Sequence, residues 1–397
     1  MNPVFRSTAY RRLWLNTAFN GVSISADYVL IGWLALKVTD TSSWVGSAFA
    51  LYYLPMLVLG VLAGSLADRF SRRRLIQALE LVAAAVIAFF AIAFAQATLS
   101  IGHVLLLTLA LGSLRAVHGP VRLAYAYDLS GARQATPALA GINVASRVGW
   151  LAGAVMAGFL TERLGITWAL AAMALMHLAA APCLAGLMSP EQTNRPQRTS
   201  LIHNLRDYLG EVKLNRVLLV LVIVTACIEV FGPSYSTVLP ELTRSRLGLG
   251  AEGLGWMHGA QAIGGLIVGL ALFILPQRRR NAGIYTACIL ALGAGLLMLA
   301  GANGLPVVLL ILAFISAMIS AWDIVTQSMM QRCVPDRLRG RAMGGWMLAI
   351  GSSPLGHLEV GFLTAAMGVE TALVVNGIGV IVLITLALLV TPALRRI

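Results

Sequence analysis

Charged side chains are scarce in this sequence. Asp, Glu, Lys and Arg make up 11% of its 397 residues, against about 25% in an ordinary soluble domain. Hydrophobic residues make up 58% and occur in long continuous runs, without the alternation of a membrane β-barrel. This composition excludes a soluble globular domain, a disordered chain and a collagen-like chain. It predicts a polytopic α-helical membrane protein, because twelve spans of about 20 residues would occupy about 240 positions.

Cysteines are few, and the common catalytic motifs are missing. The four cysteines are Cys183, Cys227, Cys288 and Cys333. Each lies in or beside an apolar run or in a segment expected on the cytoplasmic side, so we interpret them as thiols. No His-Glu-x-x-His or Gly-x-Ser-x-Gly motif is present, and Lys37 and Lys213, the only lysines, follow no Walker glycine pattern. We therefore expect neither an enzyme nor an ATP-driven pump, and no cofactor.

Basic residues outnumber acidic ones, 29 to 16, for a net charge of +13. In a soluble domain this excess would suggest a nucleic-acid partner. Here most basic residues gather in alternate connections between apolar runs, as the positive-inside rule describes. We therefore expect a multi-pass protein of a bacterial cytoplasmic (inner) membrane, in contact with membrane lipids and not with nucleic acid, with both termini in the cytoplasm.

Twelve apolar runs are long enough to be membrane spans. They cover residues 13–36, 44–67, 75–97, 104–125, 138–160, 168–187, 217–239, 254–275, 284–302, 307–329, 342–366 and 372–390. The first run carries Asn16, Asn20 and Asp27 and is too long for the apolar core of a signal peptide. We expect it to be retained as the first span.

One long hydrophilic connection, residues 189–216, separates two parts of nearly equal length. It predicts an N-terminal six-helix bundle over 1–188, a cytoplasmic linker over 189–216 and a C-terminal six-helix bundle over 217–397. Between Leu201 and Val212, apolar residues recur at helical spacing among charged ones. This spacing predicts an amphipathic helix on the membrane surface, either a simple connector or a regulatory element.

The two parts repeat each other at an offset of 203 residues. The matching positions are Gly141 with Gly344, Gly153 with Gly356, the block Gly-Phe-Leu-Thr at 158–161 with the same block at 361–364, and Gly165 with Gly368. Each part has an even number of predicted spans, so both copies have the same orientation and are related by an axis along the membrane normal. This arrangement predicts a cavity between the halves that suits alternating access. The glycines also predict close packing of the fifth and eleventh spans with their neighbours.

The turn after the second predicted span reads GSLADRFSRRR from Gly64 to Arg74. It resembles the signature loop between helices 2 and 3 of the major facilitator superfamily, in which a glycine stands at the position of Ser71. The resemblance implies a conformational switch whose acidic residue helps to lock the halves in the outward-facing state. The switch residues so implied are Gly64, Asp68, Arg69, Arg72 and Arg73. The equivalent turn of the second half, residues 275–281, keeps three arginines but has no acid.

Three further segments, 23–27, 119–129 and 331–341, look like the branch of this superfamily that contains enterobactin exporters and drug/proton antiporters. The resemblance covers essentially the whole chain. It implies an all-α fold of 12 transmembrane helices in two pseudo-symmetric six-helix bundles. It also implies export of a small-molecule substrate in exchange for protons. We expect such a protein to be a monomer.

Arg115 begins the sequence Arg-Ala-Val-His-Gly, which is similar to the Arg-x-x-Gln-Gly motif on helix 4 of proton antiporters, with His118 in place of the glutamine. In that family the arginine is implicated in proton coupling. The alternative is a structural ion pair between Arg115 and an acid on another helix, such as Glu80.

Ionisable residues inside the predicted spans are functional candidates, because each costs about 3 kcal/mol or more unless it is paired or hydrated. They are Asp27, Arg115, Arg147, Glu229, Asp323 and Glu359, and we add His357. At the offset of 203 residues, Asp27 falls on Val230, next to Glu229, so the two acids occupy nearly equivalent places. We expect them to bind a cationic or hydrogen-bonding substrate and to take up protons. The alternative is a salt bridge from either acid to Arg147 or Arg115.

Asp27, Cys227 and His357 would suit a transition-metal site if they met across the cavity. Ligands from three separate helices are a weak signal, and His357 and Glu359, two positions apart, point in different directions on a helix. We therefore expect no metal site. The predicted function is a proton-coupled exporter of an amphipathic small molecule, siderophore-like or drug-like. The alternatives are a lysophospholipid flippase and a ferroportin-like divalent metal exporter of the same fold.

Overall fold

The computed structural model describes residues 3–96, 100–131, 134–187, 216–274, 281–333, 346 and 349–391. Over these ranges the chain forms helices and turns and contains no strand. Apolar runs become helices because lipid offers no partner to a backbone N–H or C=O group, and a helix satisfies these groups within one segment. The predicted all-α membrane fold is confirmed.

Six long helices form what we call the first half. They are α1 (Thr8–Thr39), α2 (Ser42–Arg69), α3 (Arg72–Gln96), α4 (Ile101–Ser130), α5 (Ala135–Arg163) and α6 (Ile166–Ala180), with the short 3-10 helices η1 (Pro3–Arg6) and η3 (Ala181–Leu184). The side chain of Ser7 caps α1 by accepting a hydrogen bond from the backbone N–H of Tyr10. Within this half, α1 packs on α5, α2 on α4, and α3 on α6.

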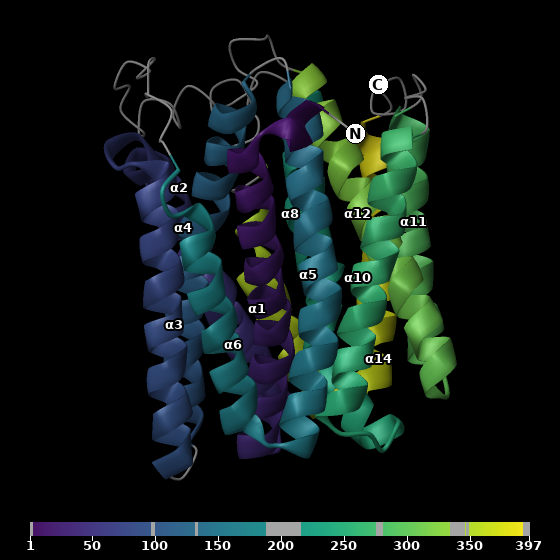
Figure 1. Cartoon of the computed structure of the whole chain (residues 1–397). Coiled ribbons are helices and arrows are strands. Elements are labelled where there is room, and N and C mark those ends of the chain that lie inside the picture. The colour runs from purple at the N-terminus through teal and green to yellow at the C-terminus, as the bar shows by residue number, and fades with distance from the viewer. Residues whose placement is uncertain are drawn as a thin grey trace.

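The remaining helices form the second half. They are α8 (Arg216–Phe231), the 3-10 helix η4 (Pro233–Val238), α9 (Leu239–Glu241), the π-helical turn η5 (Leu242–Arg246), α10 (Ala251–Ile274), α11 (Asn281–Ala300), α12 (Leu305–Arg332) and α14 (Ser353–Val390). Here α10 packs on α12, α11 on α12 and α14, and α8 on α14. Figure 1 shows both halves as upright bundles side by side.

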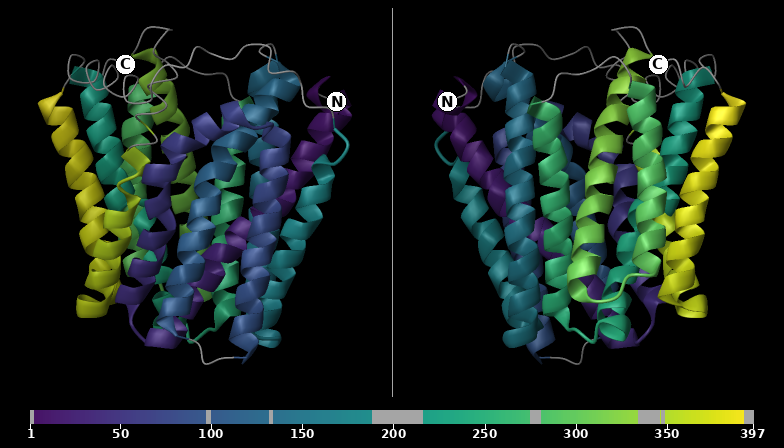
Figure 2. Two further views of the ribbon diagram at one scale, coloured as in Figure 1. Left: turned by 90° about the vertical axis from the view of Figure 1, so that its left-hand side faces the viewer. Right: turned by 90° about the vertical axis from the view of Figure 1, so that its right-hand side faces the viewer.

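Ten helical stretches in the described part of the chain are long and apolar enough to cross a membrane. The helix α14 consists of two arms, because Gly368 adopts φ 85 and ψ 167 and turns the chain back on itself (Figure 2). Adding α2 and counting the arms of α14 separately accommodates the twelve predicted spans.

Two predicted spans are not the continuous helices that the sequence suggests. The span predicted over 217–239 breaks at Gly232 and Pro233 and continues as the short segments η4, α9 and η5. In the span predicted over 342–366, residues 351 and 352 form a turn, and α14 begins at Ser353. Proline explains both breaks, since Pro233 and Pro354 cannot donate a backbone hydrogen bond and fit best in the first turn of a helix.

Residues 188–215 lie outside the described part of the chain. The predicted amphipathic helix and most of the predicted linker fall within that segment, so the domain boundary stays a prediction.

Close contacts between the halves are made by glycines of the internal repeat. A Cβ atom on Gly158 of α5 would lie 2.6 Å from the carbonyl oxygen of Ala251 on α10, and one on Gly361 of α14 would lie 2.8 Å from the Cα of Gly46 on α2. Gly158 and Gly361 are equivalent at the offset of 203 residues. The structure therefore contains two pseudo-equivalent glycine contacts between the halves, α5 with α10 and α2 with α14.

The halves also share ion pairs at the end of the bundle opposite the start of α1 and the end of α14 (Figure 1). Arg244 of η5 pairs with Asp40, the residue that ends α1, and Arg163 of α5 lies 3.8 Å from Glu252 of α10. Glu162 accepts a hydrogen bond from the backbone N–H of Ala251 at 2.8 Å. At this end the two halves are in direct contact.

Candidate functional site

A cavity of about 240 Å³ lies inside the first half and is lined by residues from all six of its long helices. The sequence led us to expect the substrate cavity between the halves. The polar residues of the lining are Asn20, Asp27, Glu80, Arg115, His118, Arg122, Ser146 and His177, and the apolar residues include Ile24, Met56, Leu111, Leu114 and Trp150. Charged groups next to apolar surface are typical of a site for an amphipathic molecule.

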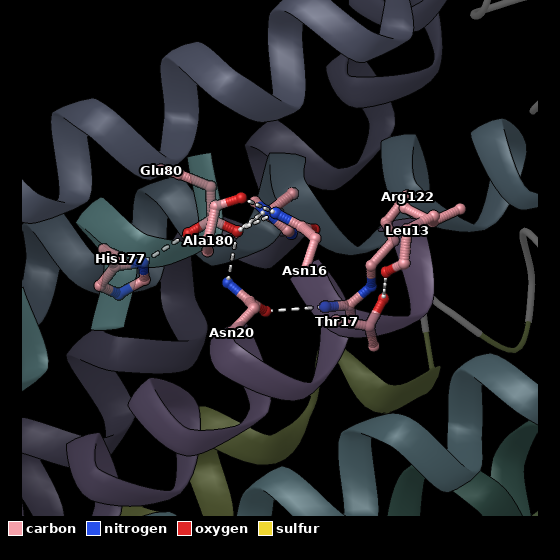
Figure 3. Close-up of polar contacts among 9 residues, drawn as sticks. Leu13, Asn16, Thr17, Asn20, Glu80, Arg122, His177 and Ala180 are labelled. Carbon is pink, nitrogen blue, oxygen red and sulfur yellow. Dashed lines mark hydrogen bonds and ion pairs between the residues drawn. The ribbon is translucent and has the colours of Figure 1, made fainter. Parts of the chain in front are cut away.

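Glu80 of α3 is completely buried and forms the centre of a polar cluster (Figure 3). Its Oε1 atom accepts hydrogen bonds from His118 Nε2 at 2.9 Å and from the Nδ2 atoms of Asn16 and Asn20 at 3.4 and 3.3 Å. Its Oε2 atom accepts one from His177 Nδ1 at 2.5 Å. An ionised carboxylate only accepts, so both imidazoles donate. One carboxylate thus connects α3 to α1, α4 and α6.

Arg122 of α4 extends this cluster. Its Nη1 atom donates to Oδ1 of Asn20 at 2.7 Å, and the side-chain amide of Asn20 in turn donates to Glu80. Figure 3 shows this chain of contacts from Arg122 through Asn20 to Glu80. Arg122 is 9% exposed and contacts Glu80 only through the amide.

Asp27 of α1 lines the same cavity and belongs to a second series of polar contacts. Its Oδ2 atom accepts a hydrogen bond from the Tyr52 hydroxyl at 2.9 Å, and Nη1 of Arg115 donates to that hydroxyl at 2.9 Å. The guanidinium carbon of Arg115 also lies 5.5, 5.3 and 6.0 Å from the ring centres of Tyr28, Tyr52 and Trp150. Arg115 is therefore held by phenols and ring faces.

The alternative ion pair between Arg115 and Glu80 does not form. His118, three positions further along α4, contacts Glu80 instead. The reason is helical geometry, since residues 115 and 118 lie on adjacent parts of one helix face. Arg115 is directed to Tyr28 of α1 and Tyr52 of α2, and His118 to α3.

Glu229 of α8 is 8% exposed and lies at the break between α8 and η4. Its Oε2 atom accepts a hydrogen bond from the Ser353 hydroxyl, at the first residue of α14, at 2.9 Å. Asp27 and Glu229 thus have similar environments in the two halves, because each carboxylate accepts a hydrogen bond from a neutral hydroxyl on a neighbouring helix. Among the described residues neither acid forms the salt bridge weighed as the alternative.

Arg147 of α5 reaches across to the second half, where its Nη2 atom donates to the Ser320 hydroxyl of α12 at 3.2 Å. Its guanidinium carbon lies 5.7 Å from the ring centre of Trp150. Asp323, one helical turn beyond Ser320, accepts a hydrogen bond from Trp346 Nε1 at 3.1 Å. The structure therefore places Arg147 and Asp323 near one another, at the junction of the halves.

His357 and Glu359 point to different partners, as their spacing predicts. His357 Nδ1 lies 2.8 Å from the Thr237 hydroxyl of η4, and the imidazole stacks on Tyr53 of α2 with ring centres 5.0 Å apart. Glu359 accepts from the side-chain amide of Asn376 at 3.3 Å, which joins the two arms of α14. His357 thus contributes to the contact between the halves, and Glu359 to the packing of the second half.

The residues considered for a metal site have other partners. Asp27 is held by Tyr52, and His357 by Thr237 and Tyr53. Within the described ranges, no three His, Cys, Asp or Glu side chains are grouped so that they could hold a metal ion.

Part of the predicted switch can be placed. Arg72 forms an ion pair with Asp128 at the end of α4, at 2.6 Å, and Arg73 donates to the backbone carbonyl of Leu187 after η3. These contacts connect the start of α3 to the end of α4 and to the segment after η3. Gly64, Asp68 and Arg69 lie in the last turns of α2, where no side chain is described, and the turn over 337–341 lies outside the described residues.

Sequence reasoning missed the residue at the centre of the site. Glu80 entered only as a possible partner of Arg115, although it is an acid inside a predicted span. Asn16 and Asn20 were noted only as polar residues of the first span, and Tyr52, Arg122 and His177 were not singled out. Applying the cost of an intramembrane charge to Glu80 would have identified it.

Comparison with known proteins gives a family match. The family model described as Major Facilitator Superfamily matches residues 13–282 of this chain. The multidrug efflux pump Tap of Mycobacterium tuberculosis is 27% identical over 397 residues, covering 96% of this chain and 91% of that protein. The staphyloferrin A transporter of Staphylococcus aureus is 25% identical over 363 residues, covering 88% of each chain.

Solved structures with the same fold include the nucleoside transporter NupG, with a TM-score of 0.77 and 13% identity over 98% of this chain and 99% of that one. A bacterial homologue of the human lysosomal transporter Spinster, solved in an inward-facing and unoccupied conformation, has a TM-score of 0.71 and 13% identity over 100% and 98% of the two chains. At these identities the likeness concerns the fold alone.

Proposed function

Since the chain belongs to the Major Facilitator Superfamily and is a multi-pass membrane transporter, we propose that it exports an amphipathic small molecule in exchange for protons. The relatives named as efflux pumps support the direction of transport. We place the protein as a monomer in a bacterial cytoplasmic membrane, with both termini in the cytoplasm. The contacts between the halves at the opposite end of the bundle then close the outer side.

The arrangement of Asp27 and Glu229 carries this proposal. Each acid lies on the first helix of its half, inside the membrane, and accepts one hydrogen bond from a neutral hydroxyl. A buried carboxylate without a cationic partner is costly when charged. Such an acid can bind a proton on one side of the membrane and release it on the other, which is what coupling requires.

The glycine contacts support alternating access. The Gly158 and Gly361 contacts pack helix backbones directly on each other, without long side chains between them. Surfaces of this kind separate and close as rigid bodies, since few side chains have to rearrange. Their pseudo-equivalent positions let the two halves rock against each other around a site between them.

Transport into proteoliposomes tests the proposal. We expect ethidium or carboxyfluorescein to be accumulated by the wild-type protein only when a pH gradient is imposed. We expect Glu229→Gln to abolish that dependence and Asp27→Asn to change it. Glu370→Gln is the matched control, because the Glu370 side chain is 74% exposed. If both acid variants keep the parental rate at every value between about pH 5 and pH 8, the coupling role is wrong.

A further inference from the structure

The arginines of the cavity have neutral partners. Arg115 donates to the hydroxyls of Tyr52 and Tyr28 at 2.9 and 3.4 Å, and Arg122 donates to the amide oxygen of Asn20 at 2.7 Å. Among the described residues, no carboxylate oxygen lies within 4.0 Å of a nitrogen of either guanidinium. Buried charges in proteins are usually paired or coordinated, so two guanidiniums without a carboxylate need an explanation.

The two acids of the same cavity do not form an ion pair with either arginine. Glu80 accepts its four hydrogen bonds from two histidines and two asparagines. Asp27 accepts from Tyr52. The first half thus contains two acids and two arginines around one cavity, and a neutral group separates each acid from the nearest arginine. This arrangement leaves guanidinium donors for a ligand.

Two residues of the cavity lining carry buried nitrogens without a hydrogen-bond partner. The Nε atom of Arg122 is buried and has no hydrogen-bond partner, and the residue is 9% exposed. His118 Nδ1 is likewise buried and without a partner, and it becomes a donor when the imidazole is protonated. Both residues line the cavity. A guanidinium presents its donors in a planar fork that matches the two oxygens of a carboxylate.

Much of the remaining lining is apolar, and the cavity is small. Its apolar residues include Ile24, Met56, Leu111, Leu114 and Trp150. Its volume of about 240 Å³ is below the range of about 300–1,000 Å³ that is usual for drug-sized ligands. The cavity therefore suits one polar end of a larger molecule, together with the apolar atoms next to it.

Resting on the transport function proposed above, we infer that this cavity binds the acidic group of an amphipathic organic anion. Arg115 and Arg122 hold its carboxylate, and the apolar wall holds the adjoining part of the molecule. The substrate class is then anionic, and not the cationic class that two acids alone suggest.

The proposal also distinguishes the two coupling acids. The titratable and charged groups around the anion are Asp27 of α1, Tyr52 of α2, Glu80 of α3, Arg115, His118 and Arg122 of α4, and His177 of α6. A charged Asp27 repels the anion, so a proton on Asp27 favours anion binding and does not compete with it. Exchange of anion for proton must then depend on Glu229, which lies in the second half.

Two dyes with one ring system and opposite charge test the inference. Carboxyfluorescein is the anionic probe and a rhodamine methyl ester is the cationic one. Binding to the purified full chain in lipid nanodiscs is followed by fluorescence anisotropy. We expect carboxyfluorescein to bind at least about tenfold more tightly. Arg115→Gln and Arg122→Gln should each weaken it by about 10-fold to 150-fold, the range for a hydrogen bond to a charged group.

Control variants separate this inference from other effects. Arg11→Gln removes the same charge from an exposed position at the start of α1 and should leave carboxyfluorescein binding unchanged. Arg122→Lys keeps the charge and should retain more carboxyfluorescein binding than Arg122→Gln. If the glutamine variant folds poorly, the lysine variant still tests the site. Asp27→Asn should tighten carboxyfluorescein binding.

Equal binding of the two dyes, or losses in Arg115→Gln and Arg122→Gln no larger than in Arg11→Gln, would overturn the inference. If the rhodamine ester is nevertheless transported with a pH gradient, the proposed exporter stands and only the anion site fails. If carboxyfluorescein binds through both arginines but no gradient drives transport, the anion site stands and the proposed coupling fails.

Discussion

Glu80 should be the residue of the first half whose loss most destabilises the helix bundle. Its carboxylate accepts hydrogen bonds from Asn16, Asn20, His118 and His177, and all five side chains are buried. In Glu80→Leu these donors lose their shared acceptor in an apolar environment. Only Asn16 retains another, the backbone oxygen of Ala180 at 3.0 Å. We expect a loss of about 3–5 kcal/mol, the usual cost of removing one partner from a buried charged pair.

Glu80→Gln should cost less. The amide oxygen can still accept from His118 and the asparagines, and His177 can change tautomer so that its Nδ1 atom accepts from the new amide. What is lost is the contribution of the charge to the hydrogen bonds, about 1–2 kcal/mol. The order wild type, Glu80→Gln, Glu80→Leu follows directly from the number of donors left without an acceptor.

The assay is unfolding of the purified protein in mixed micelles by titration with a denaturing detergent, followed by circular dichroism. Glu370→Leu serves as the control, because its side chain is exposed and its ion pair with Arg246 is a surface contact, so the unfolding free energy should change by no more than about 1 kcal/mol. If Glu80→Leu behaves like that control, the cluster does not hold the four helices together and the reasoning fails.

Two further predictions concern single contacts. Gly46→Val should separate α2 from α14, since a Cβ at this position meets the backbone of Gly361 at 2.9 Å. A strain of about 1–3 kcal/mol would shift the population of the closed contact by about 5-fold to 150-fold. Spin-label distances between α2 and α14 should lengthen in Gly46→Val but not in Gly269→Ala, where a Cβ has open space. Tyr52→Phe should cost about 1–3 kcal/mol in the same unfolding assay, because Asp27 and Arg115 both lose a buried partner. Tyr125→Phe should be neutral or stabilising, since the Tyr125 hydroxyl is buried with no partner; equal losses in the two variants would contradict the assignment.

Part of the candidate site could be named from the sequence, but the central position of Glu80 and the contacts of the site could not. The cost of a charge in lipid identifies Asp27, Arg115 and Glu229 without any structure. Which atoms satisfy these groups depends on helices that are remote in sequence. Asp27 finds Tyr52 25 positions away, and Glu229 finds Ser353 124 positions away. No local pattern specifies such pairs, and so the salt bridges weighed as alternatives were equally reasonable beforehand.

By itself, the sequence determined the class of protein and its repeat. Continuous apolar runs must form helices in lipid, so the spans follow from composition and length. The offset of 203 residues also places Gly158 and Gly361 in equivalent positions. These properties are local or additive along the chain, and they need no knowledge of which helices are neighbours.

Only the tertiary structure decided where the polar groups meet. It brought Glu80 of α3 to His118 of α4 and His177 of α6, residues 38 and 97 positions away. It paired Arg115 and Arg122 with neutral oxygens and left Arg122 Nε without a partner. The physical reason is that a buried polar group must use whatever donors and acceptors the packed helices bring within reach, and helix packing is a property of the whole bundle.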